Sequence, residues 1–224
     1  IFNEAPEWTK NKISGFKGHI WAPDISFHNG KYYLYYSVSA FGKNTSCIGL
    51  ATNSTLHSSD PKYEWIDQGI IIQSIPGRDL WNAIDPNLAF DENGIPWLAF
   101  GSFWSGIKLV RLNDNLLSIA EPQEWYTIAK RTRDFKTDDY EPGEGAIEAP
   151  FLFKKGKYFY YQDSVPSQRS TAYFRVHVFN PLRLMGQTVT VSIKVRNAVV
   201  VKKTFAINSQ HNHADWHSVN ASLM

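Results

Sequence analysis

The chain has 224 residues, of which 43% are hydrophobic and 20% charged, a composition typical of a soluble globular protein with one sizeable domain. A net charge of +2 without a basic run argues against a nucleic-acid partner, and no stretch approaches the roughly 18 apolar residues of a membrane span. The single cysteine, Cys47, excludes an intrachain disulfide framework.

Three segments of the chain read as copies of one unit, in which a proline is followed by a short apolar strand, a glycine turn and an aromatic strand. They are WAPDISFHNGKYYLYYSVSAFG, IDPNLAFDENGIPWLAFGSFWSG and EAPFLFKKGKYFYYQDS. The prolines Pro23, Pro86 and Pro150 recur every 63 or 64 residues. A fixed period with a β-hairpin in each repeat indicates a radial β architecture such as a propeller.

Strand signals dominate these copies. Residues 31–39 follow the turn His28-Asn29-Gly30, and residues 91–94 end in Asn-Gly, a strong hairpin turn. Residues 47–52 and 106–112 are predicted as the next strands outward. No segment has a sustained helical period.

A polar loop at residues 131–145 precedes the third copy, and we interpret it either as the wall of a cleft or as a surface insertion.

The repeat pattern ends after Tyr161. Beyond the third copy, strands are predicted at residues 172–179, 188–195, 199–207 and 215–223, with a hairpin turn at Arg196-Asn197. We therefore expect a propeller portion over residues 1–163 and a β-rich tail over residues 164–224, the tail being sandwich-like or a diverged blade.

Carboxylates stand just before the second and third prolines, at Asp85 and Glu148. A carboxyl pair in a cleft can cleave glycosidic bonds, because one group donates a proton while another stays ionised. Glu148 lies in the apolar segment GAIEAPF, which would raise its pKa as a general acid requires. Carboxylates beside proline also cap strands and turns, but two at matching repeat positions favour the catalytic interpretation.

Long stretches of the chain resemble glycoside hydrolase family 43. They are GHIWAPDISFHNGKYYLYYSVSAFGKNTSCIGLATN, LWNAIDPNLAFDENGIPWLAFGSFWSGIKL and GAIEAPF. The resemblance covers residues 15–161 and is strongest to the endo-acting α-1,5-L-arabinanases, which are five-bladed β-propellers. It implies an all-β fold with about three blades of a partial five-bladed propeller, and an inverting hydrolysis of arabinan.

The resemblance also implies roles for six residues. Glu148 takes the place of the general acid, and Asp85 that of the aspartate that tunes the pKa of the acid. The residues that match the family's sugar-binding positions are Trp21 and Phe41, which pack against arabinose rings, and Ile84 and Ser102, which line the subsite.

One part of the family pattern is not matched. The general base of the family lies in a motif one repeat before WAPD, and counting back 63 residues from Pro23 falls before residue 1. We therefore expect the 224-residue chain by itself to lack the base and to have negligible hydrolytic activity. Asp24 is one residue past its proline, and we expect it to be structural and turned away from the cleft.

No cofactor is required for this chemistry, although the resemblance allows a central calcium ion. His211, His213 and His217 do not match a ligand motif of the family, and we interpret them as surface histidines, so no metal ligand is predicted. An open arc of three blades would expose apolar blade faces, and we expect the tail or a second chain to cover them.

Two other functions remain possible at this point. One is a non-catalytic carbohydrate-binding protein, and the other is an exo-acting arabinofuranosidase or β-xylosidase. We expect an extracellular or periplasmic location, although no signal peptide opens the chain and its first residues resemble a processed end. The glycosylation triplets at Asn44, Asn53 and Asn220 add little to that expectation.

Overall fold

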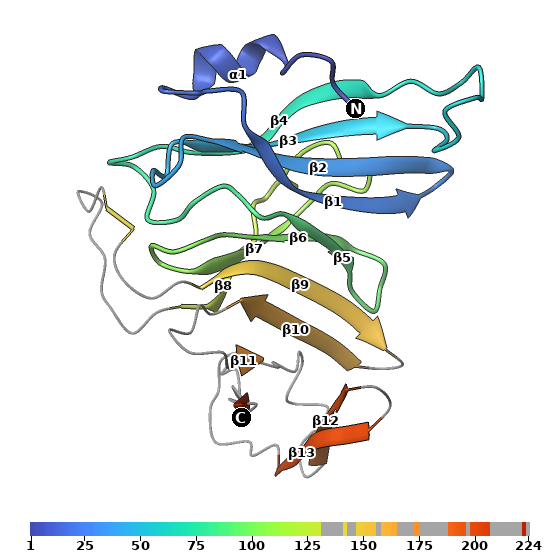
Figure 1. Cartoon of the computed structure of the whole chain (residues 1–224), viewed down its shortest axis with the longest axis vertical. Coiled ribbons are helices and arrows are strands. Elements are labelled where there is room, and N and C mark those ends of the chain that lie inside the picture. Colours follow the sequence, from blue (N-terminus) through green and yellow to red (C-terminus); the bar gives the residue numbers. More distant parts are fainter. Residues whose placement is uncertain are drawn as a thin grey trace.

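The protein is described here from a computed structural model, and nearly all of its assigned elements are β-strands (Figure 1). The structure describes residues 1–130, 141–142, 147–155, 158–164, 173–174, 188–195, 198–206 and 221–222. In chain order the elements are α1 (Glu7–Lys12), β1 (Ile20–His28), β2 (Lys31–Ser39), β3 (Ser46–Asn53), β4 (Ile66–Ser74), β5 (Asn87–Phe90), β6 (Pro96–Phe100), β7 (Ile107–Arg111), β8 (Trp125–Ala129), β9 (Glu148–Lys155), β10 (Tyr158–Ser164), β11 (Tyr173–Phe174), β12 (Thr188–Val195), β13 (Ala198–Ala206) and β14 (Ala221–Ser222). The predicted all-β fold is confirmed. Within the described ranges, no helix has the length and apolar character needed to cross a membrane.

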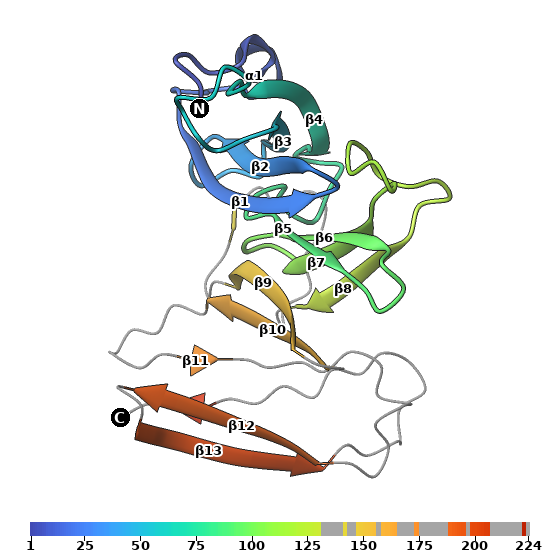
Figure 2. The ribbon, with the colours of Figure 1, turned by 90° about the vertical axis from the view of Figure 1, so that its right-hand side faces the viewer.

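The three repeats fold as three successive antiparallel blades. The first blade has the strand order β1-β2-β3-β4, the second has β5-β6-β7-β8, and β9 pairs with β10 in the third. Figures 1 and 2 show these blades as layers, one beneath another. The first strand of the second blade, β5, contacts both β1 and β9. The first strands of the three repeats are therefore the innermost strands, as the 63-residue period predicts for a propeller.

The hairpin turn of the first blade follows from its sequence. Asn29 and Gly30 have φ angles of 46° and 79°, and His28 pairs with Lys31 on either side of them. Two consecutive residues at positive φ give the turn type that matches the twist of the flanking strands, and Asn-Gly is the favoured pair for it. The sequence thus fixes the register of β1 against β2.

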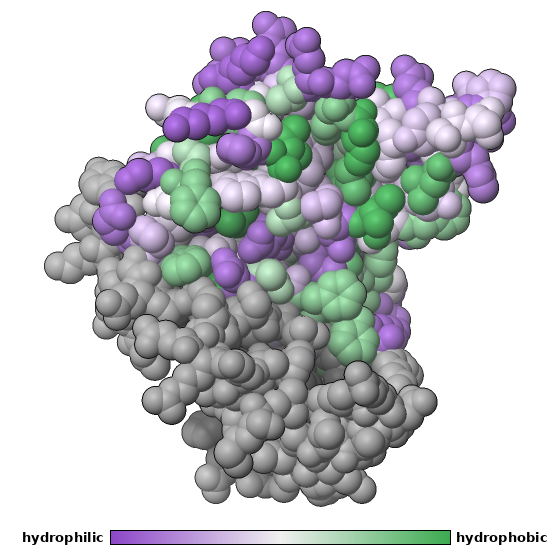
Figure 3. Space-filling model, in the orientation of Figure 1, coloured by the Kyte–Doolittle hydropathy of each residue, from purple (hydrophilic) through white to green (hydrophobic). Residues whose placement is uncertain are grey.

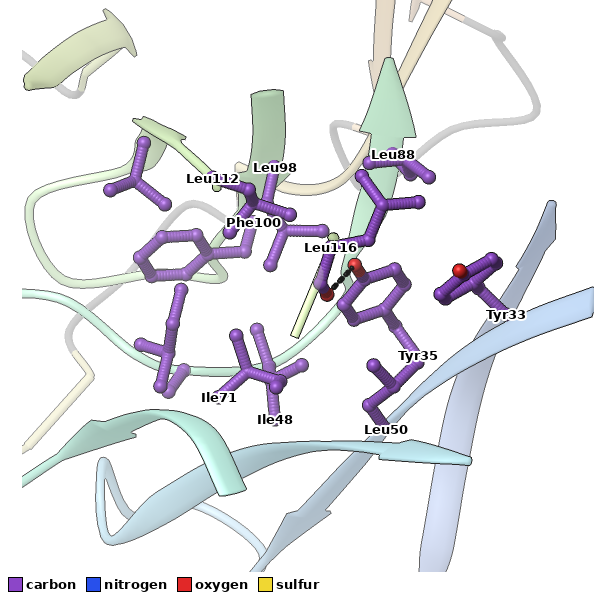
Figure 4. Packing of buried hydrophobic residues seen from close by; sticks show 13 residues of the cluster. Tyr33, Tyr35, Ile48, Leu50, Ile71, Leu88, Leu98, Phe100, Leu112 and Leu116 are labelled. Atoms are coloured by element: carbon purple, nitrogen blue, oxygen red, sulfur yellow. Dashed lines mark hydrogen bonds between the residues drawn. The ribbon is translucent and has the colours of Figure 1, made fainter. Parts of the chain in front are cut away.

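A hydrophobic core fills the space between the first and second blades (Figure 4). Tyr35 of β2 reaches across it, and its buried hydroxyl donates to the Leu116 carbonyl at 2.7 Å. The other buried members of this core are Tyr33, Ile48, Leu50, Ile71, Ile72, Ala83, Leu88, Leu98, Phe100, Val110 and Leu112. A second core, which includes Ile107, Leu152 and Tyr161, joins the second blade to the third. Side chains shared between blades therefore hold the arc together.

The outer face of the first blade is covered by the N-terminal segment. Trp8 of α1 stacks on Tyr36 with ring centroids 6.3 Å apart. Both residues donate to Asp67, the Tyr36 hydroxyl at 2.7 Å and the Trp8 indole nitrogen at 2.9 Å. Figure 3 shows hydrophilic residues gathered over this end of the molecule. Burial on both faces explains why β2 reads as an almost continuous apolar run.

The outer strands β4 and β8 were not predicted from the sequence. In β4 the pairing with β3 shifts register beside Gly69, whose φ is 82°. A bulge of this kind interrupts the alternation of inward and outward side chains, which is the main signal for a strand. The strand β8 has only five residues, which is too short for a clear alternating pattern.

The tail contains the predicted hairpin of β12 and β13, in which Val195 pairs with Ala198 around the expected turn. A short pair of β11 and β14 lies within the other two predicted tail strands, whose remaining residues are outside the described part of the chain. The three tail histidines are outside it as well. The domain boundary at residue 163 stays a prediction.

The second blade offers a test of how closely its backbone packs. Gly106 has a φ of 89°, and a Cβ atom there would lie 2.3 Å from the carbonyl oxygen of Ala129. Gly94 has a similar φ of 80° but has open space around that position. We expect Gly106→Ala to lower the free energy of unfolding by about 1–3 kcal/mol more than Gly94→Ala, because only Gly106 adds a backbone clash to the strain of positive φ. Urea unfolding of both variants measures this difference, and equal losses would contradict the packing described here.

Candidate active site

The residue directly before each recurring proline has a left-handed backbone. The φ angles are 45° at Ala22, 56° at Asp85 and 54° at Ala149. This conformation is uncommon for residues other than glycine. At the same point, the pairing of β1 with β2 and of β9 with β10 shifts register. Each innermost strand therefore begins at a kink, and kinks of this kind redirect the side chains beside them.

Asp85 and Glu148 do not occupy matching positions in their repeats. Asp85 lies one residue before its proline, whereas Glu148 lies two residues before its own. The counterpart of Asp85 in the third copy is Ala149, and the counterpart of Glu148 in the second copy is Ile84. The prediction of matching positions was wrong by one residue. Asp85 is itself the kink residue of its repeat, whereas Glu148 lies one residue before the kink at Ala149, at the start of the neighbouring innermost strand.

The structure nevertheless brings these carboxylates together. The Asp85 Oδ2 atom accepts a hydrogen bond from the Ala149 backbone N–H at 3.0 Å, directly beside Glu148. Ser102 forms an antiparallel bridge with Glu148, and its hydroxyl donates to Glu148 Oε2 at 2.9 Å. Three of the six predicted site residues thus form one cluster at the junction of the second and third blades.

Asp85 is the electrostatically unusual member of the cluster. The pKa of its carboxyl is raised to about 6: burial is the largest cause, the hydrogen bond from the Ala149 N–H lowers the pKa, and the nearby Glu148 carboxylate raises it. A proton therefore stays on this carboxyl to a higher pH than on an exposed aspartate.

Three buried serine hydroxyls of the first blade bind the segment that carries Asp85. The Asp85 backbone N–H donates to the Ser37 hydroxyl at 2.9 Å, and Ser37 is fully buried. Upstream in the segment, Asn82 Oδ1 accepts from the Ser46 hydroxyl at 2.6 Å, and the Ala83 N–H donates to the Ser74 hydroxyl at 3.0 Å. Sequence reasoning missed these residues, because small polar side chains inside strands resemble solvent-facing positions.

Trp21 and Phe41 form an aromatic pair beside the cluster. Their ring centroids lie 6.0 Å apart, and Phe41 is 88% exposed. Trp21 pairs across β1 and β2 with Ser37, the residue that binds the Asp85 backbone. The indole N–H of Trp21 is buried, and within the described part of the chain it has no hydrogen-bond partner. Exposed aromatic faces are the surfaces on which sugar rings stack.

The remaining predicted residue, Ile84, is partly buried, and its carbonyl accepts from the Gly101 N–H at 2.8 Å. Of the long loop at residues 131–145, the structure describes only Glu141 and Pro142. Glu141 forms an ion pair with Lys43 at 3.3 Å, so this loop and the loop that carries Phe41 meet. The rest of the loop is outside the described residues.

Asp24 lies at the junction of the first and second blades. Burial raises the pKa of its carboxyl, whereas hydrogen bonds from Leu88 and Asn87 lower it. Both carboxylate oxygens accept from these N–H donors, at 3.0 Å and 3.2 Å. The Asp24 carboxylate is therefore bound within the protein.

The described residues contain no cluster of three or more histidine, cysteine, aspartate or glutamate side chains that could hold a metal ion. The central calcium ion that the resemblance allows stays an expectation, and no step proposed for the site involves an ion. Two of the glycosylation triplets are buried. Asn44 and Asn53 are 2% and 3% exposed, so neither amide can carry a glycan in the folded chain, and Asn220 is outside the described residues.

Comparison with known proteins decides the family. Residues 2–217 match the model for glycosyl hydrolases family 43. The chain belongs to glycosyl hydrolase family 43. The match of this family 43 chain extends beyond the 147 residues that carry the sequence resemblance and includes much of the tail.

Relatives named for arabinan chemistry match about 160 residues of the chain. Over 159 residues the chain is 55% identical to an extracellular exo-α-(1→5)-L-arabinofuranosidase of Cellvibrio japonicus, covering 71% of this chain and 46% of the relative. Over 160 residues it is 44% identical to an extracellular endo-α-(1→5)-L-arabinanase of Bacillus subtilis, covering 71% and 45%. The family 43 chain thus spans about half the length of the curated relatives that it matches.

Solved structures support the fold. An α-L-arabinanase of Cellvibrio cellulosa superposes with a TM-score of 0.72 at 50% identity, covering 79% of this chain and 57% of that one. The same values hold for its complex with arabinohexaose. The family 43 chain is accordingly a partial five-bladed propeller, with two complete blades and the inner hairpin of a third in its described part.

The raised pKa of Asp85 predicts how stability depends on pH. The pKa of the Asp85 carboxyl is 3.8 in the unfolded chain and about 6 in the folded protein. The contribution of this carboxyl to the free energy of unfolding is therefore fully present below pH 3.8 and is lost as the pH rises through 6. The difference of about two pH units corresponds to roughly 3 kcal/mol. Asp85→Asn keeps the acceptor for Ala149 and removes the charge. We therefore expect Asp85→Asn to exceed the wild type in stability by up to about 3 kcal/mol at pH 8, with the gap closing toward pH 4.

Urea unfolding of both proteins between pH 4 and pH 8 measures this gap. Asp114→Asn, which changes an exposed aspartate, is the matched control and should show little dependence on pH. A gap for Asp85→Asn that stays constant with pH would show that ionisation of Asp85 does not oppose folding.

Proposed function

We propose that the protein hydrolyses α-1,5-linked L-arabinan with inversion, and that Glu148 is the general acid. The observation that carries this proposal is the cluster in which Glu148 is bound by Ser102 beside the buried carboxyl of Asp85. Membership of family 43 and relatives named for α-(1→5)-L-arabinan chemistry support the choice of reaction and substrate.

In the proposed reaction, Glu148 donates its proton to the glycosidic oxygen as the bond to the leaving sugar breaks. Asp85 has two roles. It accepts from the Ala149 N–H, which positions the start of β9, and its charge couples to that of Glu148.

Inversion also needs a base that activates water on the opposite side of the sugar, with its carboxyl roughly 6.5–9.5 Å from that of the acid. Asp85 lies beside the acid, and both Asp24 oxygens accept protein N–H groups. We assign the base to neither residue. That the 224-residue chain tested by itself has negligible turnover stays a prediction, and the intact protein in the tests below is a form that also carries the base.

We propose that arabinose units stack on Trp21 and Phe41 and extend toward the cluster past Ile84 and Ser102. The exposed Phe41 ring, which packs beside Trp21, supports this path. The arabinohexaose complex of the Cellvibrio cellulosa structure supports an arabino-oligosaccharide ligand. Endo action is our first proposal. Exo action is the second, because the relative with 55% identity is named an exo-acting enzyme.

An extracellular location is proposed from the same relatives, both of which are named extracellular. We also propose that a second chain or the tail covers the face of β9 opposite Leu152, which points away from the second blade. Phe151 and Phe153 of β9 are 49% and 41% exposed there, which supports a surface that packs against a further partner.

Removal of the acid tests the proposed reaction. In the intact protein, Glu148→Gln should lower kcat on linear arabinan by about 10²–10⁴-fold, because an amide cannot donate the proton. The loss should be much smaller on an aryl arabinofuranoside with a good leaving group, which needs little protonation. Reducing-sugar release and aryl release measure the two rates, and the sizes of the early products separate endo from exo action.

Glu7→Gln, which changes an exposed glutamate on α1, is the control and should leave both rates unchanged. Equal losses on the two substrates would mean that Glu148 is not the acid. Binding of arabinan by the intact wild type without any release of sugar would replace the hydrolase with a carbohydrate-binding protein.

A further inference from the structure

The innermost strands β5 and β9 lie at the edges of their sheets, so their inward N–H groups have no partner strand. Such groups must bind elsewhere if they are buried. The Leu88 N–H donates to Asp24 Oδ2 at 3.0 Å, and the Leu152 N–H donates to Asn87 Oδ1 at 2.7 Å. In each case a side chain of one blade binds the backbone of the next blade.

These contacts repeat with the architecture. Asp24 and Asn87 each stand directly after the recurring proline of their copy, and each binds the N–H two residues after the proline of the following copy. The third copy has Phe151 at this position, which has no side-chain oxygen. The series of contacts therefore runs from the first blade to the third and ends there.

Asp24 also sets the orientation of the Asn87 amide. The Asn87 Nδ2 group donates to Asp24 Oδ1 at 3.2 Å, which leaves Oδ1 of the amide facing the Leu152 N–H. Asn87 is 3% exposed, so a reversed amide would place its NH₂ group against a buried N–H with no water to separate them. The contact in the first junction therefore determines the contact in the second.

Two backbone segments are held at both ends by this arrangement. In the second blade, Ser37 binds the Asp85 N–H and Asp24 binds the Leu88 N–H. In the third blade, Asp85 binds the Ala149 N–H and Asn87 binds the Leu152 N–H. The first segment carries Asp85, and the second directly follows Glu148.

We propose that Asp24 and Asn87 form a relay of positioning residues that fixes the separation of Asp85 and Glu148. The proposal rests on the proposed function. A displacement of catalytic groups by about 1 Å can cost on the order of 100-fold in rate, so a relay that sets the spacing of adjacent blades controls turnover without touching substrate.

An isosteric exchange of the two side chains tests the relay. Asp24→Asn alone leaves an amide NH₂ facing the Asn87 NH₂, and Asn87→Asp alone leaves two buried carboxylates facing each other. The double variant Asp24→Asn/Asn87→Asp restores every contact, because the new amide at 24 donates to the new carboxylate at 87, whose second oxygen accepts from Leu152. The volume and the net charge of the protein are unchanged in the double variant.

The readout is kcat and KM per folded molecule on linear arabinan in the intact protein, well below the unfolding temperature. Each single variant should lose about 10–100-fold in kcat with KM within a few-fold of the wild type, and the double variant should recover most of that loss. Exposed residues of the same types provide the control. Asp114→Asn and Asn93→Asp, alone and together, should leave kcat unchanged.

Single variants that fold and keep the wild-type kcat would overturn the proposal, as would a double variant that is no better than either single one. A merely structural role would lower the midpoint of urea unfolding in the single variants while leaving kcat per folded molecule intact. If the wild type releases no sugar, the proposed function fails, and the midpoint of urea unfolding then replaces kcat as the test of the relay. In that case recovery of the urea midpoint in the double variant supports the relay, and no recovery overturns it.

Discussion

The unpaired edge of each innermost strand is the constraint on which this site depends. In a propeller these edges converge near the axis, where the backbone N–H groups are shielded from water and have no neighbouring strand. Here side chains of the preceding blade bind them, as Asp24 does for Leu88 and Asn87 does for Leu152. The same bonds that satisfy the backbone also set the spacing between blades. Structural and catalytic requirements therefore fall on adjacent residues.

Asp85 shows the cost of placing a carboxyl at this junction. Its burial and its proximity to Glu148 raise its pKa to about 6, so its ionised form opposes folding. The hydrogen bond from Ala149 offsets only part of this effect. A residue that served stability alone would be neutral at this position. The unfavourable charge is consistent with a site at which catalysis, and not folding, determines the residue.

Family membership and local geometry contribute different parts of the interpretation. Family 43 and its arabinan-directed relatives support the type of reaction and the sugar. The geometry adds two contacts: the Ser102 hydroxyl donates to Glu148, and the buried Ser37 hydroxyl accepts from the Asp85 N–H. The chain spans about half the length of these relatives, and its described part contains the surroundings of Glu148, the proposed acid.

The sequence by itself determined the repeat, the strands of the three copies and the residues that cluster, because prolines, glycine turns and alternating apolar residues are local signals. The turn at Asn29-Gly30 and the hairpin of β12 and β13 are examples. Only the tertiary structure showed that Asp85 lies at a backbone kink and that Glu148 lies directly before another, because a positive φ before proline has no sequence signature here. It also revealed the partners of Asp24, Asn87 and Ser37. Those partners lie on other blades, 48 to 65 residues away in the chain, and only folding brings them within hydrogen-bonding distance.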